Sequence, residues 1–232
     1  MTADRDPAAG AGAGLQQLRR SPLAHRAADL AAISGGVRVS ELPFLSMISL
    51  RVDPSSAAAA RVEQALGVAL PGSGAVATAT AGEGAVAPGP ASATGEGPSV
   101  LWLGPDEWLV VGADDDATTV LTLLDAAVGG DRGSVVEVSS HHTTLVIRGP
   151  QARDLLEKGC TVDLHPRSFG AGQCARTTFA RGQLLLWQTD ADGPLGPVYR
   201  LLIGSSFAGY FADWLTDAAA EFRSGMMPNR GI

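Results

Sequence analysis

The sequence contains little lysine, asparagine, cysteine or charge. Among its 232 residues, Lys158 is the only lysine, Asn229 is the only asparagine, and 18% of the residues are charged. The 24 acidic residues outnumber the 17 basic ones, which gives a net charge of −7. Nucleic-acid-binding proteins usually carry a basic stripe. This sequence has none, so we expect no nucleic-acid partner.

The sequence also has no long apolar run, although 45% of its residues are apolar. No run approaches the ~20 residues that span a bilayer. Residues 1–14 lack the apolar core of a secretory signal. The two cysteines, Cys160 and Cys174, are too few for a disulfide scaffold and lack metal-ligand spacing. We therefore expect a cytoplasmic chain with reduced thiols and no membrane segment.

Motifs for cofactor binding and nucleophilic catalysis are absent as well. The sequence has no G-x-G-x-x-G dinucleotide fingerprint, no phosphate-binding G-x-x-x-x-G-K-[ST] and no G-x-S-x-G nucleophile turn. His141 and His142 are the most conspicuous polar pair. Adjacent residues on a strand point to opposite faces, so we expect them not to share a metal ion. No residue is assigned to catalysis, to a cofactor or to a metal.

Apolar patterning divides the chain into two tails, one domain and a low-complexity insertion. Residues 1–34 are predicted to be a tail with a short helical segment, and residues 223–232 form a second tail. The domain covers 35–222 and is interrupted at 71–99, where nearly all residues are small or polar. Such a segment buries too little apolar surface to offset chain entropy. We therefore expect a long loop there.

Alternating and helical periodicities predict the elements of the domain. Asp53 and Pro54 are expected to cap and open a helix that ends at Leu66, and Ser205 to cap the last helix, which runs to about Phe222. The predicted strands cover 37–39, 44–52, 100–103, 107–111, 134–138, 143–148, 175–180, 184–189 and 198–203; other helices follow residues 114–116 and 149–150. This order predicts an α+β fold of two consecutive ferredoxin-like split βαβ units, with antiparallel sheets and helices packed on them.

Several longer blocks resemble one known family. They are LWLGPDEWLVV at 101–111, a block at 136–187 that contains RGPQARDLLEKGC and DLHPRSF, and YRLLIGSSFAGYFADWLTDAAAEF at 199–222. Together they resemble the gamma subunit of heterotetrameric sarcosine oxidase, over most of residues 37–222. The insertion at 71–99 and both tails lie outside the resemblance.

The resemblance implies a place in a complex of alpha, beta, gamma and delta subunits. Such a complex oxidises sarcosine to glycine and hydrogen peroxide, and the one-carbon unit leaves as formaldehyde or as 5,10-methylenetetrahydrofolate. FAD, FMN, NAD and tetrahydrofolate belong to the alpha and beta subunits, and zinc to the delta subunit. The gamma chain is similar in fold to the folate-binding domain of aminomethyltransferases. By this resemblance it carries no cofactor, is inactive alone and supports assembly with the alpha subunit.

Interface candidates follow from the residue types that dominate protein–protein contacts. Within the matched blocks these are Trp108, His141, His142, Arg148 and Arg153. The residues leave two other functions open. One is a stand-alone folate-binding or aminomethyltransferase-like protein, in which Lys158-Gly159-Cys160 would begin a folate-associated motif that the next residues do not continue. The other is an accessory subunit of an oxidase for a related N-methyl amine such as dimethylglycine.

Overall fold

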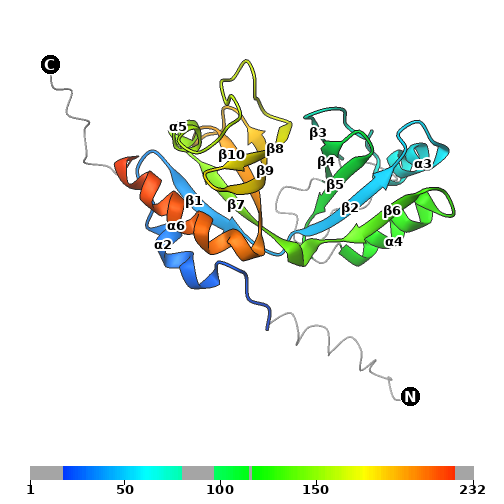
Figure 1. Ribbon diagram of the computed structural model, residues 1–232, viewed down its shortest axis with the longest axis horizontal. Coiled ribbons are helices and arrows are strands. Elements are labelled where there is room, and N and C mark those ends of the chain that lie inside the picture. Colours follow the sequence, from blue (N-terminus) through cyan, green and yellow to red (C-terminus); the bar gives the residue numbers. More distant parts are fainter. Residues whose placement is uncertain (1–17, 80–96, 115–116, 223–232) are drawn as a thin grey trace, which may run out of the picture.

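The computed structural model describes residues 18–79, 97–114 and 117–222. In this part of the chain, ten strands form two five-stranded antiparallel sheets, and helices cover the outer side of each (Figure 1). The predicted α+β class with two antiparallel sheets is confirmed.

Sheet 1 has the strand order β3-β4-β5-β2-β6. Its elements are β2 Ser46–Val52, α3 Ala57–Leu66, β3 Val76–Thr78, β4 Ser99–Gly104, β5 Glu107–Gly112, α4 Ala117–Val128 and β6 Gly133–Glu137. β5 lies between β2 and β4, and β2 lies between β5 and β6, so two β-α-β pieces interlock. This is the predicted split βαβ unit.

The α3 helix shows how local sequence fixes an element in sheet 1. The side chain of Ser56 accepts a hydrogen bond of 3.2 Å from the Ala59 N–H, and Gly67 ends the helix with a φ of 70°. The prediction that Asp53 caps this helix is wrong. Asp53 instead accepts hydrogen bonds from the Ser55 N–H and hydroxyl, so it stabilises the turn that precedes the capping residue Ser56.

Sheet 2 has the order β1-β7-β10-β9-β8. Its elements are α2 Ala27–Ala31, β1 Arg38–Leu42, β7 His142–Arg148, α5 Ala152–Glu157, β8 Gln173–Phe179, β9 Gly182–Asp190, β10 Val198–Gly204 and α6 Ala208–Ala218. β8, β9 and β10 form an antiparallel meander, and β10 returns beside β7.

The edge strand β1 corrects the prediction of two consecutive units. It comes before all of sheet 1 in the chain, yet it pairs with β7, from Arg38 opposite Arg148 to Leu42 opposite Thr144. Val39 is buried in the same apolar cluster as Ile147. The burial of this alternating face decides the sheet to which the strand belongs.

Two other predictions need correction. The segment 71–99 is not wholly a loop, because β3 lies inside it and pairs with β4, from Val76 opposite Leu101 to Thr78 opposite Ser99. Residues 80–96 of that segment lie outside the described residues. Ser205 does not cap the last helix with its side chain, because its hydroxyl donates to the Ser140 carbonyl at 3.1 Å.

Three apolar clusters hold these layers together. One lies between sheet 2 and its helices, and a second between sheet 1 and α3 and α4. The third fills the space between the two sheets and consists of Met47, Leu101, Leu109, Val111, Cys174, Leu185, Trp187 and Leu202. The sheets therefore face each other across a shared core, and any open site between them lies at its margins.

Candidate functional site

The chain passes from one sheet to the other twice, and the two crossings lie side by side. The first crossing is 43–45, between β1 and β2; the second is 138–141, between β6 and β7. The Val138 N–H donates to the Met47 carbonyl at 2.8 Å, and the Met47 N–H donates to the Ser139 hydroxyl at 3.0 Å. These hydrogen bonds hold the two crossing segments together at the edge of the shared core, and the pockets open at this edge.

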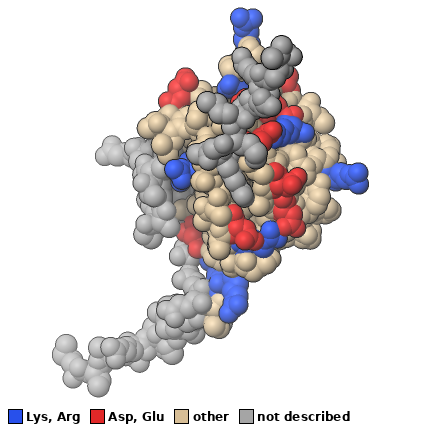
Figure 2. Space-filling view, turned by 90° about the vertical axis from the view of Figure 1, so that its left-hand side faces the viewer, with Lys and Arg blue, Asp and Glu red and all other residues tan. Residues whose placement is uncertain are grey.

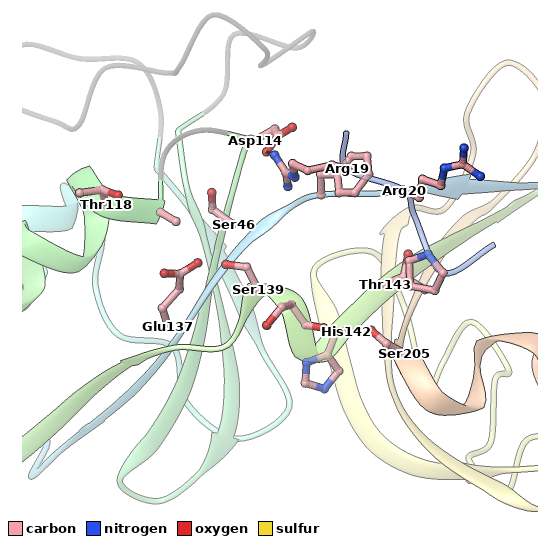
Figure 3. A pocket seen from close by; sticks show the side chains of 14 residues that line it. Arg19, Arg20, Ser46, Asp114, Thr118, Glu137, Ser139, His142, Thr143 and Ser205 are labelled. Atoms are coloured by element: carbon pink, nitrogen blue, oxygen red, sulfur yellow. Dashed lines mark hydrogen bonds and ion pairs between the residues drawn. The ribbon is translucent and has the colours of Figure 1, made fainter. Parts of the chain in front are cut away.

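The larger pocket opens at these crossings and has a volume of ≈ 740 Å³. The Arg19 guanidinium forms an ion pair of 2.8 Å with Asp114 and lies 4.2 Å from the centre of the Phe44 ring. Phe44 has a φ of 63°, a conformation that is uncommon for a residue other than glycine. The ion pair thus ties the segment before α2 to the end of sheet 1 that precedes α4 (Figure 3).

Hydroxyl groups line the larger pocket, but several already donate hydrogen bonds to the chain. Ser46 donates to the Ala113 carbonyl at 2.6 Å, and Thr143 donates to the Glu41 carboxylate at 2.7 Å. Their main effect is to hold the crossing segments. Among the described residues, no group of three or more His, Cys, Asp or Glu side chains could hold a metal ion.

A smaller pocket of ≈ 340 Å³ lies on the other side of His142, which lines both pockets. Its remaining lining residues are Leu103, Leu109, His141, Arg176, Gln183, Leu184, Leu185, Leu202 and Gly204. Arg176 contacts Glu107 across the two sheets at 3.5 Å. Five leucines therefore line this pocket together with two histidines and one arginine.

The two histidines lie together, contrary to the expectation from strand geometry. His141 belongs to the 3-10 turn Ser139–His141 and only His142 belongs to β7, and the ring centres are 5.0 Å apart. In Figure 3 the His142 ring points away from Arg19 and Arg20. Its Nδ1 is buried and has no hydrogen-bond partner among the described residues.

The charge state of His142 follows from this environment. Burial, and next the nearby His141, lower the pKa of His142 below its usual range, although the Val138 carbonyl opposes this. The ring is therefore neutral at pH 7 and offers one donor and one acceptor.

The other three interface candidates lie elsewhere. Trp108 is 2% exposed in the core of sheet 1, and its Nε1–H donates to the Pro71 carbonyl at 2.9 Å. Arg148 is exposed at the opposite end of β7 from His142. The Nε of Arg153 is buried without a hydrogen-bond partner among the described residues. Burial raises the pKa of the Tyr199 hydroxyl, and the charge of Arg153 partly offsets this effect.

Neither cysteine is an activated thiol. Burial raises the pKa of Cys174 from 9.0 to about 11, and its thiol faces the carbonyls of Ala75 and Trp102 at 3.5 Å. Burial also raises the pKa of Cys160. Lys158 lies just after α5, where its ammonium donates to the Ala218 carbonyl at 2.7 Å and pairs with Glu221. Lys158 and Cys160 do not line either pocket described above.

One structural residue was not singled out from the sequence. Glu41 accepts hydrogen bonds from the hydroxyls of Ser21 and Thr143 and from the Leu23 N–H. An acidic residue in an edge strand is common and carries no sequence signal of its own. The anchoring role of Glu41 follows only from its hydrogen bonds to residues distant in the chain. Among the described residues, no helix has the length and apolar character needed to cross a bilayer.

Known proteins match this chain over most of its length. A model described as sarcosine oxidase, gamma subunit family, matches residues 51–221. The sarcosine oxidase subunit gamma of Corynebacterium sp. (strain U-96) is 36% identical over 216 residues, which cover 89% of this chain and 92% of that protein. The corresponding subunit of Arthrobacter sp. is 34% identical over 209 residues, with 89% and 93% covered.

Solved structures agree with these matches. A chain of heterotetrameric sarcosine oxidase from Corynebacterium sp. U-96, in complex with pyrrole 2-carboxylate, superposes with a TM-score of 0.75 at 36% identity, covering 89% of this chain and 97% of that one. The glycine cleavage system aminomethyltransferase T from Bartonella henselae superposes with a TM-score of 0.58 at 14% identity, covering 82% of this chain and 48% of that one, and shares the fold alone. The predicted likeness to aminomethyltransferases is thus confirmed for the fold, and the chain belongs to the sarcosine oxidase gamma subunit family.

Proposed function

We propose that this chain is a non-catalytic subunit that supports assembly of a sarcosine-oxidising complex by docking on the alpha subunit. The observation that carries the proposal is the match, at 36% identity, to a chain of a heterotetrameric sarcosine oxidase, 97% of which is covered. Near-complete coverage means that this chain has the elements of a subunit of that assembly. The complex would yield glycine and hydrogen peroxide, and the one-carbon unit would leave as formaldehyde or as 5,10-methylenetetrahydrofolate.

The arrangement of the interior supports an accessory role. The space between the sheets is occupied by large apolar side chains such as Leu101 and Trp187, and the pKa of the buried Cys174 is raised rather than lowered. A catalytic cysteine needs the opposite, a lowered pKa that favours its thiolate. In this proposal, FAD, FMN, NAD and tetrahydrofolate bind to the alpha and beta subunits and zinc to the delta subunit. We also propose a cytoplasmic location.

Co-expression tests the proposal directly. The chain would be expressed alone and together with the alpha, beta and delta subunits, and each preparation would be assayed for peroxide production from sarcosine. We expect the isolated chain to be colourless and inactive, and the co-expressed chain to purify with the active complex. Recovery of a fully active complex from which this chain is absent would refute the proposal.

A second candidate function is folate binding by the chain itself. The larger pocket, at ≈ 740 Å³, falls within the size range of small-molecule sites, and this supports the alternative. Calorimetry with tetrahydrofolate on the isolated chain tests it. Micromolar binding that is lost in Thr118→Trp, which places a bulky side chain at the edge of this pocket, would favour this function.

The substrate of the complex is a separate question, because the match concerns a subunit. An oxidase for a related N-methyl amine would have the same assembly role for this chain. The co-expressed complex should be assayed with sarcosine and with dimethylglycine at matched concentrations. A higher kcat/KM for sarcosine is expected, and a higher value for dimethylglycine would change the proposed substrate but not the role of this chain.

A further inference from the structure

The smaller pocket is lined by five leucines, two histidines and one arginine, together with Gln183 and Gly204. Leu103 and Leu109 come from sheet 1, and Leu184, Leu185 and Leu202 come from sheet 2, so both sheets contribute side chains to the lining. His141, His142 and Arg176 are the titratable or charged residues that line it, and no acidic residue does. A concave surface that combines apolar side chains with a few polar groups is the usual form of a binding site.

Arg176 keeps most of its hydrogen-bonding capacity. Its side chain is 55% exposed and contacts Glu107 at 3.5 Å, a long distance for an ion pair. A guanidinium has five N–H donors, so this contact leaves donors for an incoming carboxylate. His141 and His142 add imidazole groups to the lining of this pocket.

Two exposed aromatic side chains follow Gly204 in the chain. Gly204 lines the pocket, and three residues later Phe207 is 53% exposed; Tyr210 follows at 37%. The Tyr210 hydroxyl accepts a hydrogen bond from the Arg181 N–H at 3.2 Å, which holds the ring near the start of β9. Exposed aromatic and arginine side chains are typical of the residues that dominate binding energy at interfaces.

The helical side of sheet 2 differs in charge, because its pocket of ≈ 440 Å³ is lined by the acidic Asp217 and Glu221 as well as by Lys158. Figure 2 shows this side, where Asp and Glu side chains gather among Lys and Arg. Arg26 pairs with both Asp29 and Asp213 there, and Lys158 pairs with Glu221. Those acidic side chains are closely paired with cations of the chain, whereas Arg176 at the smaller pocket makes only the longer, 3.5 Å contact with Glu107.

We propose that the smaller pocket receives an apolar side chain and a neighbouring carboxylate from the partner subunit on which this chain docks. This inference rests on the proposed function. Charge complementarity identifies the occupant, because the lining contains one arginine and no acidic residue, and the long 3.5 Å contact of Arg176 with Glu107 leaves guanidinium donors for a second carboxylate. A volume of ≈ 340 Å³ suits a small group of side chains rather than a helix.

A steric variant can fill the pocket without disturbing the fold. Gly204 has a φ of −60°, which any residue adopts, and a Cβ there would meet no atom within 4 Å. Gly204→Leu therefore adds a side chain at the pocket. Gly130→Leu is the matched control, because a Cβ at Gly130 also meets nothing within 4 Å and this residue does not line the pocket.

A charge variant tests the carboxylate. Arg176→Glu reverses the charge of the one arginine that lines the pocket, and Arg51→Glu is its matched control. Both arginine side chains are 55% exposed, and each pairs with a carboxylate of the same turn, Glu107 or Asp106. Arg51 does not line the pocket. A reversed charge opposite a carboxylate should weaken association about ten-fold or more.

The experiment measures subunit association in the co-expressed complex at several salt concentrations, by titrated pull-down and sedimentation. We expect Gly204→Leu and Arg176→Glu to weaken association about ten-fold or more, and Gly130→Leu and Arg51→Glu to match the unmodified chain. Thermal unfolding of each isolated variant must show an intact fold.

If the unmodified chain assembles and both pocket variants assemble equally well, the inference is wrong and the proposed function stands. If the unmodified chain itself fails to assemble, the proposed function fails. Binding of free benzoate to the isolated chain, together with normal assembly of both pocket variants, would assign the pocket to a small carboxylate and overturn the inference.

Discussion

The Glu41 carboxylate accepts a hydrogen bond of 2.7 Å from the Thr143 hydroxyl, although 102 residues separate the two in the chain. The same carboxylate accepts a bond of 2.5 Å from the Ser21 hydroxyl and one of 3.3 Å from the Leu23 N–H. Leu23 is fully buried and Thr143 is 2% exposed. One side chain therefore joins the segment before α2 to the strand that follows the second crossing between the sheets.

Glu41→Ala should destabilise the chain and loosen its N-terminal segment. The change leaves buried donors without an acceptor, which typically costs about 1–3 kcal/mol. Urea unfolding should show this loss, and hydrogen exchange should increase over residues 21–33 before the sheets exchange. The exposed Glu137 provides the control, and Glu137→Ala should have little effect. Equal exchange in the Glu41 variant and the unmodified chain would contradict the anchoring role.

Trp108→Phe should destabilise the isolated chain by about 1–3 kcal/mol, because the Pro71 carbonyl loses its buried donor. Trp102 lies opposite Trp108 in the register of β4 and β5 and is less buried, so Trp102→Phe is the comparison. Guanidinium unfolding measures both. If Trp108 serves the fold, association with the partner subunits should be unchanged at temperatures where the variant remains folded.

Gly149→Ala should be far more damaging than Gly172→Ala. Both glycines have positive φ angles, 135° and 77°. A Cβ at Gly149 would overlap the Gly36 carbonyl oxygen, whereas one at Gly172 would meet nothing within 4 Å. We expect a loss of about 1–2 kcal/mol for Gly172→Ala, from backbone strain alone, and more than about 3 kcal/mol for Gly149→Ala. Thermal unfolding of the two variants should separate them clearly.

Cys174 should make stability fall at alkaline pH. Its folded pKa, about 11, exceeds the ordinary 9.0, so the folded state holds the proton more tightly than the unfolded state. The contribution is fully present below pH 9 and is lost as the pH rises through about 11. The loss is about 2–3 kcal/mol. Tyr199 and Lys158 have shifted pKa values of their own, so the slope should be compared with that of Cys174→Ala, which retains both. Equal slopes between pH 9 and 11 would contradict this assignment.

Elements stabilised by nearby residues could be predicted from the sequence. The hairpin of β4 and β5 has its turn residues between two apolar runs, and the end of α3 at Gly67 follows from the glycine itself. The cap of the same helix was misplaced, because Asp53, Ser55 and Ser56 all favour this kind of position. Geometry selects Ser56, since its hydroxyl is the one that reaches the Ala59 N–H.

Features that depend on distant partners were not predictable in the same way. β1 and β3 are short strands. Their sequences do not indicate that β1 pairs with β7 or that β3 pairs with β4. Strand geometry predicts opposite faces for the two histidines, whereas the 3-10 turn places their rings near each other. The smaller pocket draws leucines from four different strands, so its existence depends on the packing of the two sheets.

The pairing of β1 with β7 also sets an order of events during protein synthesis. Sheet 1 is built from residues 46–137, a continuous stretch, so it can form as soon as that stretch leaves the ribosome. Arg38 emerges early but must wait for Arg148, about 110 residues later, which takes roughly 5–20 s at ordinary translation rates. During that interval Val39 has no sheet to join. The apolar face of β1 is therefore the last part of the N-terminal half to be covered, because sheet 2 closes only when β7 arrives.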